Sequence, residues 1–416
     1  MDWRDTPEQQ RWRNEVRTVL ETELPEPFRE ATRRGEEFSL FGGRDSGQGG
    51  PEMARAYESW RKSLSKRGWI APHWPKEYGG AGLSPVEQFI MTQEFAEAGA
   101  PPLGGLGVTH IGPTLIAYGT EEQKKEHLGR ILDGSVVWCQ GYSEPGAGSD
   151  LASLQTRAVR DGDDFVINGQ KIWTSGAHQS DWMFCLVRTD PEAPKHRGIT
   201  YLLIDMKAPG VSTRPLVNMA NHHHFNEVFF EDVRVPVTNA VGEINRGWYV
   251  GAATLDYERS SIGIVGGQRK TVERSIGIVG GQRKTVERYI GWLRDNRQQM
   301  SPATYVALRN EWAERWVEMA VAIQLSYRVI SMQASGLIPN SEASITKLYS
   351  SELTQRVAAS GMKTLGMMGA VRENRAPMEG RIPDRYMTAV SSTIAGGTSE
   401  IMRNIIATRG LGLPRG

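Results

Sequence analysis

Apolar residues recur at helical spacing through the first third of the chain. Residues 6–9 (Thr-Pro-Glu-Gln) have the form of a capping box with proline at the first helical position, and Trp12 begins the apolar stripe that follows. The same start signal returns at residues 84–87 (Ser-Pro-Val-Glu) and 120–123 (Thr-Glu-Glu-Gln). These patterns predict an N-terminal all-α domain over residues 1–135.

Strand patterns then replace the helical spacing. Residues 136–139 (Val-Val-Trp-Cys) form a short apolar run, and Asn168-Gly169 stands between apolar segments, which indicates a two-residue hairpin turn. Three more apolar runs suit strands, at residues 182–187, 200–204 and 228–235. The pattern predicts a middle β domain over residues 136–246.

Helical spacing returns at Gly247 and continues to the end, with breaks near residues 336–339 and 395–397. We therefore predict a C-terminal α-helical bundle over residues 247–416. Helices, then strands, then helices make the chain an α+β protein in which a β domain lies in sequence between two helical domains.

The charge balance argues against two classes of partner. The chain of 416 residues carries 49 basic and 48 acidic side chains, a net charge of +1, so no general field draws it to nucleic acid or to an anionic membrane. No run approaches the ~20 apolar residues that span a bilayer. Cys139 and Cys185 lie in apolar runs and suit buried thiols in a reducing compartment. We expect a cytoplasmic protein without membrane insertion.

A glycine-rich turn follows the first predicted strand. It reads Tyr-Ser-Glu-Pro-Gly-Ala-Gly-Ser-Asp over residues 142–150, so a ligand can approach its backbone closely, although a plain surface turn explains its composition as well. The motif closely resembles the flavin-binding signature of the acyl-CoA dehydrogenase family, and the resemblance extends over nearly the whole chain. It implies two helical domains and a central β-barrel that enclose FAD, with a C-terminal bundle that makes the subunit contacts.

The resemblance implies a set of FAD contacts. Ser143 would hydrogen-bond the pyrimidine edge of the flavin, which accumulates negative charge on accepting hydride, and Ser149 would reach the pyrophosphate or the substrate. Trp173-Thr174-Ser175 resembles the family's Trp-Ile-Thr; taken alone, Trp173 suits a core residue beside a hairpin. The expected FAD-binding residues are Gln140, Tyr142, Ser143, Ser149, Trp173, Thr174, Ser175, Gly397, Thr398 and Glu400.

The last of these positions lie in residues 396–403 (Gly-Gly-Thr-Ser-Glu-Ile-Met-Arg), where two glycines precede a helix whose free amides can bind an anion. A Gly-Gly turn with a threonine cap explains the local sequence equally well. Residues 146–148 (Gly-Ala-Gly) lack the spaced third glycine of a dinucleotide fingerprint, so NAD is not indicated.

The expected catalytic base is Glu258. Dehydrogenation of an acyl thioester needs a carboxylate that removes the α-proton, and many family members carry it where this chain has Gly396. A minority place it on a helix of the C-terminal domain in a Leu-Asp-Xaa-Glu-Arg context, which residues 255–259 (Leu-Asp-Tyr-Glu-Arg) match. A solvated helix residue is the alternative interpretation of Glu258. The expected substrate contacts are Ser149, Asp256, Tyr257 and Arg259.

Three successive histidines, His222, His223 and His224, do not indicate a metal site. Neighbouring residues of a strand point to opposite faces, and no cysteine or acidic residue stands nearby at ligand spacing. We expect a packing or substrate-wall role for them, and no metal.

Residues 261–274 are identical to residues 275–288. Perfect copying over fourteen residues is typical of a recent duplication, because repeat folds need longer units in larger number. The first copy contains Glu273, which lacks the Leu-Asp-Tyr that precedes Glu258, so Glu258 remains the expected base. Residues 283–286 (Arg-Lys-Thr-Val) match only in part the family segment that binds FAD across a dimer.

We therefore expect an FAD-dependent acyl-CoA dehydrogenase of fatty acid metabolism (β-oxidation) that forms a trans-2-enoyl-CoA and passes electrons to an electron-transfer flavoprotein. The protein is expected to be a homo-oligomer (dimer or tetramer) or a hetero-oligomer with a paralogue. Two alternatives remain: a flavin oxidase or monooxygenase on the same fold, and a flavin-binding subunit that supports a catalytic partner.

Overall fold

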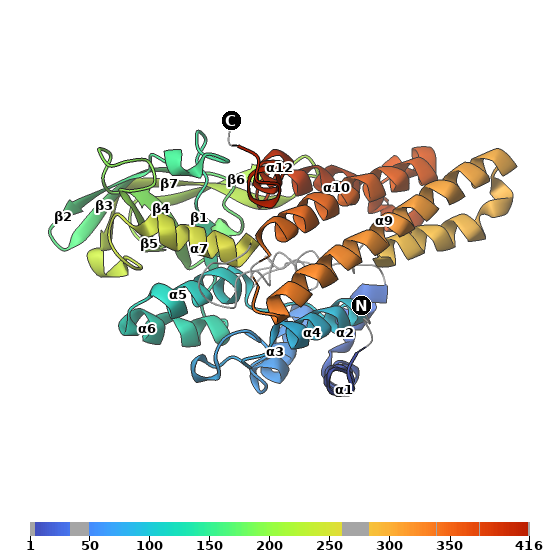
Figure 1. Cartoon of the computed structure of the whole chain (residues 1–416), viewed down its shortest axis with the longest axis horizontal. Helices are drawn as coiled ribbons and strands as arrows, with labels where there is room; N and C mark the ends of the chain where they lie inside the picture. The colour runs from blue at the N-terminus through green and yellow to red at the C-terminus, as the bar shows by residue number, and fades with distance from the viewer. Residues whose placement is uncertain (1–4, 34–49, 260–282, 338, 374, 415–416) are drawn as a thin grey trace.

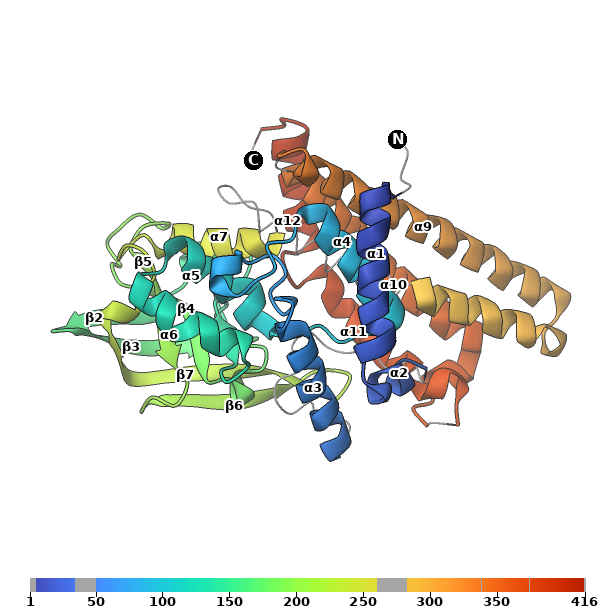
Figure 2. The same cartoon turned by 90° about the horizontal axis from the view of Figure 1, so that it is seen from below.

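The computed structural model describes residues 5–33, 50–259, 283–337, 339–373 and 375–414, and for residues 255–259 it describes the backbone only. The strands gather at one end of the molecule, and the long helices α9 (Pro302–Ala334) and α10 (Asn340–Leu365) extend toward the other. The N-terminal helices run along one side of both (Figures 1 and 2). The predicted α+β class and the order of helices, strands and helices are confirmed.

Six α-helices make up the described N-terminal part: α1 (Pro7–Glu23), α2 (Glu26–Arg33), α3 (Gly50–Ser65), α4 (Pro85–Ala98), α5 (Gly112–Tyr118) and α6 (Glu121–Leu132). The three predicted helix starts are confirmed. Thr6, Ser84 and Thr120 each accept the backbone N–H three residues on, and the Gln or Glu side chain at that position bonds back to the cap.

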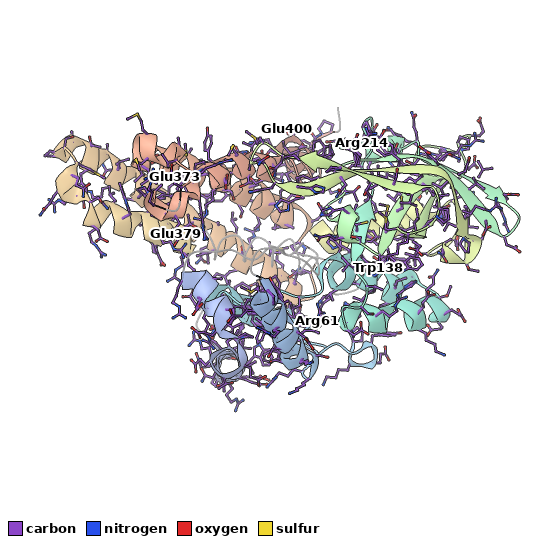
Figure 3. All side chains as sticks on the ribbon, turned by 180° about the vertical axis from the view of Figure 1, so that it is seen from behind. Arg61, Trp138, Arg214, Glu373, Glu379 and Glu400 are labelled. Atoms are coloured by element: carbon purple, nitrogen blue, oxygen red, sulfur yellow. The ribbon has the colours of Figure 1, made fainter. Side chains whose placement is uncertain are left out.

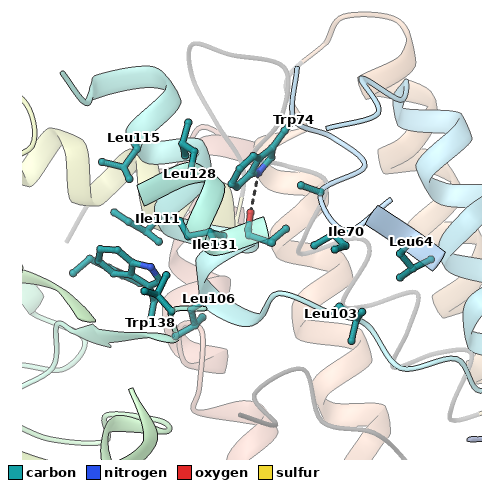
Figure 4. Close-up of a cluster of buried hydrophobic side chains, with 14 of the residues drawn as sticks. Leu64, Ile70, Trp74, Leu103, Leu106, Ile111, Leu115, Leu128, Ile131 and Trp138 are labelled. Atoms are coloured by element: carbon teal, nitrogen blue, oxygen red, sulfur yellow. Dashed lines mark hydrogen bonds between the residues drawn. The ribbon is translucent and has the colours of Figure 1, made fainter. Parts of the chain in front are cut away.

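The N-terminal helices and the first strand share one hydrophobic core. Trp74 is 1 % exposed, its indole N–H donates to the carbonyl of Val108 at 3.1 Å, and Trp138 of the first strand belongs to the same cluster (Figure 4). Gly112 is required here, because a Cβ on it would come within 1.9 Å of the Trp74 ring. The first strand of the β domain is therefore held in place by its packing against the N-terminal helices.

The middle part is a seven-stranded sheet in the order β1-β4-β2-β3-β7-β6, with β5 paired to β4. The strands are β1 (Trp138–Gly141), β2 (Arg157–Asp161), β3 (Asp164–Lys171), β4 (Trp182–Arg188), β5 (Ile199–Asp205), β6 (Val211–Val217) and β7 (His223–Pro236). The predicted strands at 182–187, 200–204 and 228–235 lie in β4, β5 and β7. The sequence pattern did not predict β2 and β6, whose side chains are mostly exposed.

The predicted hairpin turn at Asn168-Gly169 is wrong. Both residues lie inside β3, where the register against β7 shifts between Ile167 and Gly169, so they form a bulge. Gly169 has φ +149°, and a Cβ on it would come within 2.8 Å of the Thr156 backbone. The hairpin between β2 and β3 instead turns at Gly162, whose φ is +61°.

The C-terminal part is helical, as predicted. It comprises α7 (Gly247–Arg259), helical residues 283–295, α9, α10, α11 (Ile382–Ala389) and α12 (Ser399–Ile405). Its core includes Tyr289 stacked on Trp312, with ring centroids 4.6 Å apart. Most of the duplicated stretch lies outside the described residues. The domain boundaries after residues 135 and 246 remain predictions.

Across the part of the chain that the structure describes, no helix combines the length and apolarity needed to cross a membrane.

Candidate functional site

The glycine-rich turn is a closed loop after β1. Glu144 and Ala147 exchange two backbone N–H···O hydrogen bonds of 3.0 Å, so the chain reverses between them. Tyr142 and Ala147 are buried, whereas Ser149 is exposed. The start of the loop is therefore packed into the protein, and its end is exposed to solvent.

The carboxylate of Glu144 ties this loop to β2 and β3. It accepts hydrogen bonds from the backbone N–H of Gln155 (2.7 Å) and Thr156 (2.9 Å) and from Nζ of Lys171 (2.8 Å). Lys171 is fully buried and also donates to the carbonyl of Tyr142 at 3.2 Å. Burial acts to raise the pKa of Glu144, but the charge of Lys171 and these hydrogen bonds outweigh it and lower the pKa. The loop is thus fixed by a satisfied, buried ion pair.

A second segment lies beside the loop. The N–H of Ile172 donates to the carbonyl of Ser143 at 2.9 Å. Trp173 has a left-handed backbone (φ +58°), and its side chain is 60 % exposed, edge-on to Phe225 with ring centroids 6.0 Å apart. Thr174 is 1 % exposed, and its Oγ1 has no hydrogen-bond partner among the described residues. The two segments lie side by side, and their residues Ser143, Trp173 and Thr174 are called the wall below.

These groups fit the flavin that the sequence resemblance implies. A flavin needs a flat apolar surface and hydrogen-bond donors at its edge. The exposed indole of Trp173 offers the surface, and the hydroxyls of Thr174 and Ser143 offer donors. Gln140 and Ser175, both half-buried, belong to the same two segments. A buried hydroxyl without a partner costs about 1–3 kcal/mol, which a bound acceptor recovers.

The expected contacts near the C-terminus lie at the start of α12. Gly396 and Gly397 have positive φ (+67° and +98°), and Thr398 caps the helix by accepting the N–H of Ile401 at 3.2 Å. Glu400 is exposed at the outer surface (Figure 3). Hydrogen bonds from its own backbone N–H and from Thr398 lower the pKa of Glu400. The threonine cap of the alternative interpretation is thus present, and the FAD contacts of these residues stay predictions.

An open hollow of about 450 Å³ lies at this helix start. Its lining comes from the C-terminal helices and the turn before α12: Glu352, Gln355, Arg356, Thr393, Ile394, Thr398, Ser399, Glu400 and Arg403. Thr398 and Glu400 therefore share one hollow, which none of the expected β-domain residues lines. The structure brings together the expected residues of the 142–143 and 173–175 segments, whereas Thr398 and Glu400 line this separate hollow.

A second hollow, of about 320 Å³, lies beside the end of the glycine-rich loop. Arg157, Arg188 and Lys195 give its lining a basic character. The Arg188 guanidinium donates to the carbonyl of Ala152 at 2.6 Å, and Lys195 pairs with Asp150. The sequence did not predict this surface, because its basic residues are far apart in the chain.

Helix α7, which carries the expected base, is tied to the glycine-rich loop through buried hydroxyls. Oγ1 of Thr254 lies 2.9 Å from Oγ1 of Thr114 and 3.4 Å from the hydroxyl of Tyr201. Burial raises the pKa of Tyr201, and hydrogen bonds with Thr254, Tyr142 and Thr114 oppose that rise. These bonds join α5, β5, α7 and the residue that begins the loop.

Glu258 follows Thr254 by one helical turn on α7, since four residues make about one turn. The side chains of Glu258 and of the expected substrate contacts Asp256, Tyr257 and Arg259 lie outside the description. Their roles stay predictions.

The histidines lie where β7 begins. His178 and His223 stack with ring centroids 4.1 Å apart, and His222 Nε2 is 4.0 Å from Asp384 of α11. Burial and the neighbouring imidazoles lower the pKa of His178 and of His224. No group of three histidine, cysteine, aspartate or glutamate side chains within the described ranges is arranged to hold a metal ion. The strand start thus faces the C-terminal helices.

Three residues that hold the wall in place escaped the sequence analysis: Glu144, Lys171 and Asn226. Glu144 stood inside the quoted motif but was assigned no role. Lys171 had a usable signal, because a lysine within an apolar strand segment is rarely buried without a charged partner. Asn226, which is fully buried, had no signal in the sequence.

Comparison with known proteins covers nearly the whole chain. Three family models match in order: the acyl-CoA dehydrogenase N-terminal domain over residues 6–135, the middle domain over residues 139–233 and the C-terminal domain over residues 245–411.

Individual relatives and solved structures belong to the same family as the matching models. Acyl-CoA dehydrogenase FadE26 of Mycobacterium tuberculosis is 36% identical over 418 residues, covering 99% of this chain and 98% of its own. The Tcur3481–Tcur3483 steroid ACAD has a TM-score of 0.81 at 35% identity, and the ChsE4–ChsE5 complex from M. tuberculosis has 0.77 at 34%; each comparison covers 100% of both chains. The chain therefore belongs to the acyl-CoA dehydrogenase family and is an FAD-dependent oxidoreductase.

Proposed function

We propose that the protein dehydrogenates a steroid-derived acyl-CoA thioester at its α and β carbons to give the trans-2-enoyl-CoA. The observation that carries this proposal is the paired wall of Ser143, Trp173 and Thr174, which offers an exposed indole and an unsatisfied buried hydroxyl. The steroid substrate class is inferred from the steroid ACAD that the chain resembles over its full length. A straight-chain substrate of fatty acid β-oxidation is the competing substrate class.

FAD, when bound, supplies the hydride acceptor of the reaction. The residues proposed to hold it are Gln140, Tyr142, Ser143, Ser149, Trp173, Thr174, Ser175, Gly397, Thr398 and Glu400. The loop residues among them are held by the Glu144–Lys171 pair and by the Ile172–Ser143 hydrogen bond, so they need little rearrangement on binding.

Glu258 is the proposed base that takes the α-proton of the thioester. Its helix is fixed at Thr254, and the position of the alternative base is Gly396, which has no side chain to accept a proton. Ser149, Asp256, Tyr257 and Arg259 are proposed to contact the substrate. The basic hollow with Arg157, Arg188 and Lys195 suits the phosphates of CoA.

The proposed electron acceptor is an electron-transfer flavoprotein. A flavin oxidase is the second candidate, because it would use the same wall with oxygen as the acceptor. Peroxide release under air separates the two: the proposal predicts slow peroxide release without an added acceptor and rapid turnover with one.

We also propose a hetero-oligomer with a paralogous chain in the cytoplasm. The two solved relatives above are each named as a pair of different chains. Tyr386, Val390 and Ile394 stand four residues apart at the surface and are exposed, as an apolar subunit contact requires. A homodimer or homotetramer is the alternative, and native mass measurement with and without the co-expressed paralogue decides between them.

A panel of acyl-CoA thioesters tests the substrate class. Anaerobic addition of a steroid-derived acyl-CoA should bleach the flavin absorbance faster than straight-chain acyl-CoAs do. Bleaching by no acyl-CoA in the panel, with FAD bound, would overturn the proposed reaction.

A further inference from the structure

The segment that carries Trp173 and Thr174 is held by the side chain of one residue on the neighbouring strand β7. Asn226 of β7 is fully buried, and its Nδ2 donates to the carbonyl of Thr174 at 3.1 Å. The backbones of the two residues are also paired. The N–H of Thr174 donates to the carbonyl of Asn226 at 3.0 Å, and the N–H of Asn226 donates to the carbonyl of Thr174 at 3.1 Å. Thr174 is therefore fixed at both its backbone groups by one residue.

Two imidazoles complete the arrangement. Nδ1 of His178 lies 3.0 Å from Nδ2 of Asn226, and Nε2 of His223 lies 2.9 Å from Oδ1 of Asn226. The amide nitrogen is a donor, so His178 accepts at Nδ1 and carries its proton at Nε2; the amide oxygen is an acceptor, so His223 donates at Nε2. The two rings stack 4.1 Å apart with 24° between their planes. This network needs a neutral His178.

A second proton on His178 would break the network at one defined bond. Nδ1 of a protonated ring is a donor and would face the donor Nδ2 of Asn226. Burial and the neighbouring His223 lower the pKa of His178, which agrees with a neutral ring in the folded protein.

Among the described residues, the other charged groups near the pair do not supply an acceptor for a protonated Nδ1 of His178. His222 directly precedes β7, and His224 lies on it. Arg214 and Glu227 pair across β6 and β7 at 3.8 Å, and Arg372 pairs with Asp384 at 2.8 Å, leaving His222 4.0 Å from that carboxylate. The neighbouring imidazoles add positive charge when protonated. Protonation of His178 therefore removes its hydrogen bond from Asn226 without providing another, and the hold of Asn226 on Thr174 weakens.

We propose that Asn226 is a positioning residue that holds the Trp173–Thr174 segment against the flavin, and that the stacked pair of His178 and His223 makes this hold pH-dependent. The inference rests on the proposed function, since it assigns the flavin to this wall. The left-handed backbone of Trp173 supports it, because an unusual conformation persists only where its surroundings hold it.

The test measures FAD binding to the purified full-length chain, without substrate, by flavin fluorescence and by circular dichroism of the bound flavin. The FAD dissociation constant of the wild type should rise as the pH falls through the pKa of His178, which burial lowers below the ordinary histidine value of about 6.5, because the neutral form of His178 is the binding form. Asn226→Ala should raise the constant by about tenfold at neutral pH, as the loss of one buried hydrogen-bonded partner implies.

Two variants make the test specific. Asn239→Ala is the matched control, because Asn239 also donates its amide to a backbone carbonyl, that of Leu203 at 2.9 Å, but stands in the turn after the far end of β7. His178→Gln keeps an acceptor and cannot take a proton, so its dissociation constant should vary with pH far less than that of the wild type. Equal FAD affinities of Asn226→Ala and Asn239→Ala would overturn the positioning role. A wild-type pH profile in His178→Gln would overturn the pH-dependence. A chain that binds FAD in this pattern but is not bleached by any acyl-CoA refutes only the proposed reaction.

Discussion

Nζ of Lys171 lies 2.8 Å from Oε1 of Glu144, and the two side chains are 0 % and 9 % exposed. The pair joins the glycine-rich loop to the end of β3, which are 27 residues apart in sequence. A buried ion pair adds little net stability over an apolar pair, but the removal of one partner leaves the other charge without compensation. The pair therefore fixes where the loop lies more than it stabilises the fold.

Lys171→Met should be strongly destabilising, by roughly 3–5 kcal/mol in the free energy of unfolding, because the Glu144 carboxylate would lose its buried counter-charge. Denaturant unfolding measures the effect. Lys207→Met is the control: Lys207 pairs with Asp181 at 2.8 Å but is 75% exposed, so its loss should cost less than about 1 kcal/mol. Similar losses for the two variants would show that the buried pair has no special role.

The same pair predicts an acid sensitivity. The pKa of Glu144 is lowered in the folded state, so its contribution to stability is complete above the ordinary carboxyl pKa of about 4.3 and is lost as the pH falls through the lowered value. The double variant Glu144→Gln, Lys171→Met should lose less stability than the wild type between neutral pH and that range. Parallel stability curves for the two proteins would contradict this assignment.

Thr254→Val should destabilise the protein by about 1–3 kcal/mol, because valine keeps the shape but leaves the hydroxyls of Thr114 and Tyr201 with one partner fewer. Since α7 carries Glu258, kcat should fall while FAD content stays constant. Thr254→Ser retains the hydroxyl and should restore most of both. If Val and Ser variants have the same kcat, the hydroxyl does not position the helix.

Deletion of residues 275–288 should preserve folding and activity and raise thermal stability. The described end of the second copy is packed on two sides: Val286 is fully buried in the C-terminal core, and Lys284 donates to the carbonyl of Ala96 on α4 at 2.9 Å. Because the copies are identical, Val272 and Lys270 would then precede Tyr289 at the same spacing. A loss of both melting temperature and turnover would mean that the duplication is part of the working structure.

The sequence predicted the features that depend on local chemistry. The caps at Thr6, Ser84 and Thr120 and the buried strands β4 and β5 follow from residue type and period. Asn168-Gly169 gave a wrong hairpin prediction, because the preference for positive φ suits a bulge as well as a hairpin. Only the close approach of Thr156 distinguishes the two. The Asp161-Gly162 turn carried the competing signal.

The candidate site also contains residues that the sequence predicted and residues that it did not. Its motif residues could be identified in the sequence, but the groups that hold them could not. Asn226 acts through contacts with Thr174 and His178, which are 52 and 48 residues away, and such pairings arise only from the register of β7 and the turn before β4. Partners that are distant in sequence leave no local pattern.

The most direct test of the account is the anaerobic reduction of bound FAD by acyl-CoA in Glu258→Gln, beside Glu273→Gln as the matched control from the duplicated stretch. The amide keeps the shape of the side chain but cannot take the α-proton, so Glu258→Gln should retain FAD and reduce it at least about a hundredfold more slowly than the wild type, while Glu273→Gln reduces it at the wild-type rate. Flavin bleaching by Glu258→Gln at a rate near that of the wild type would contradict the assignment of the base to α7.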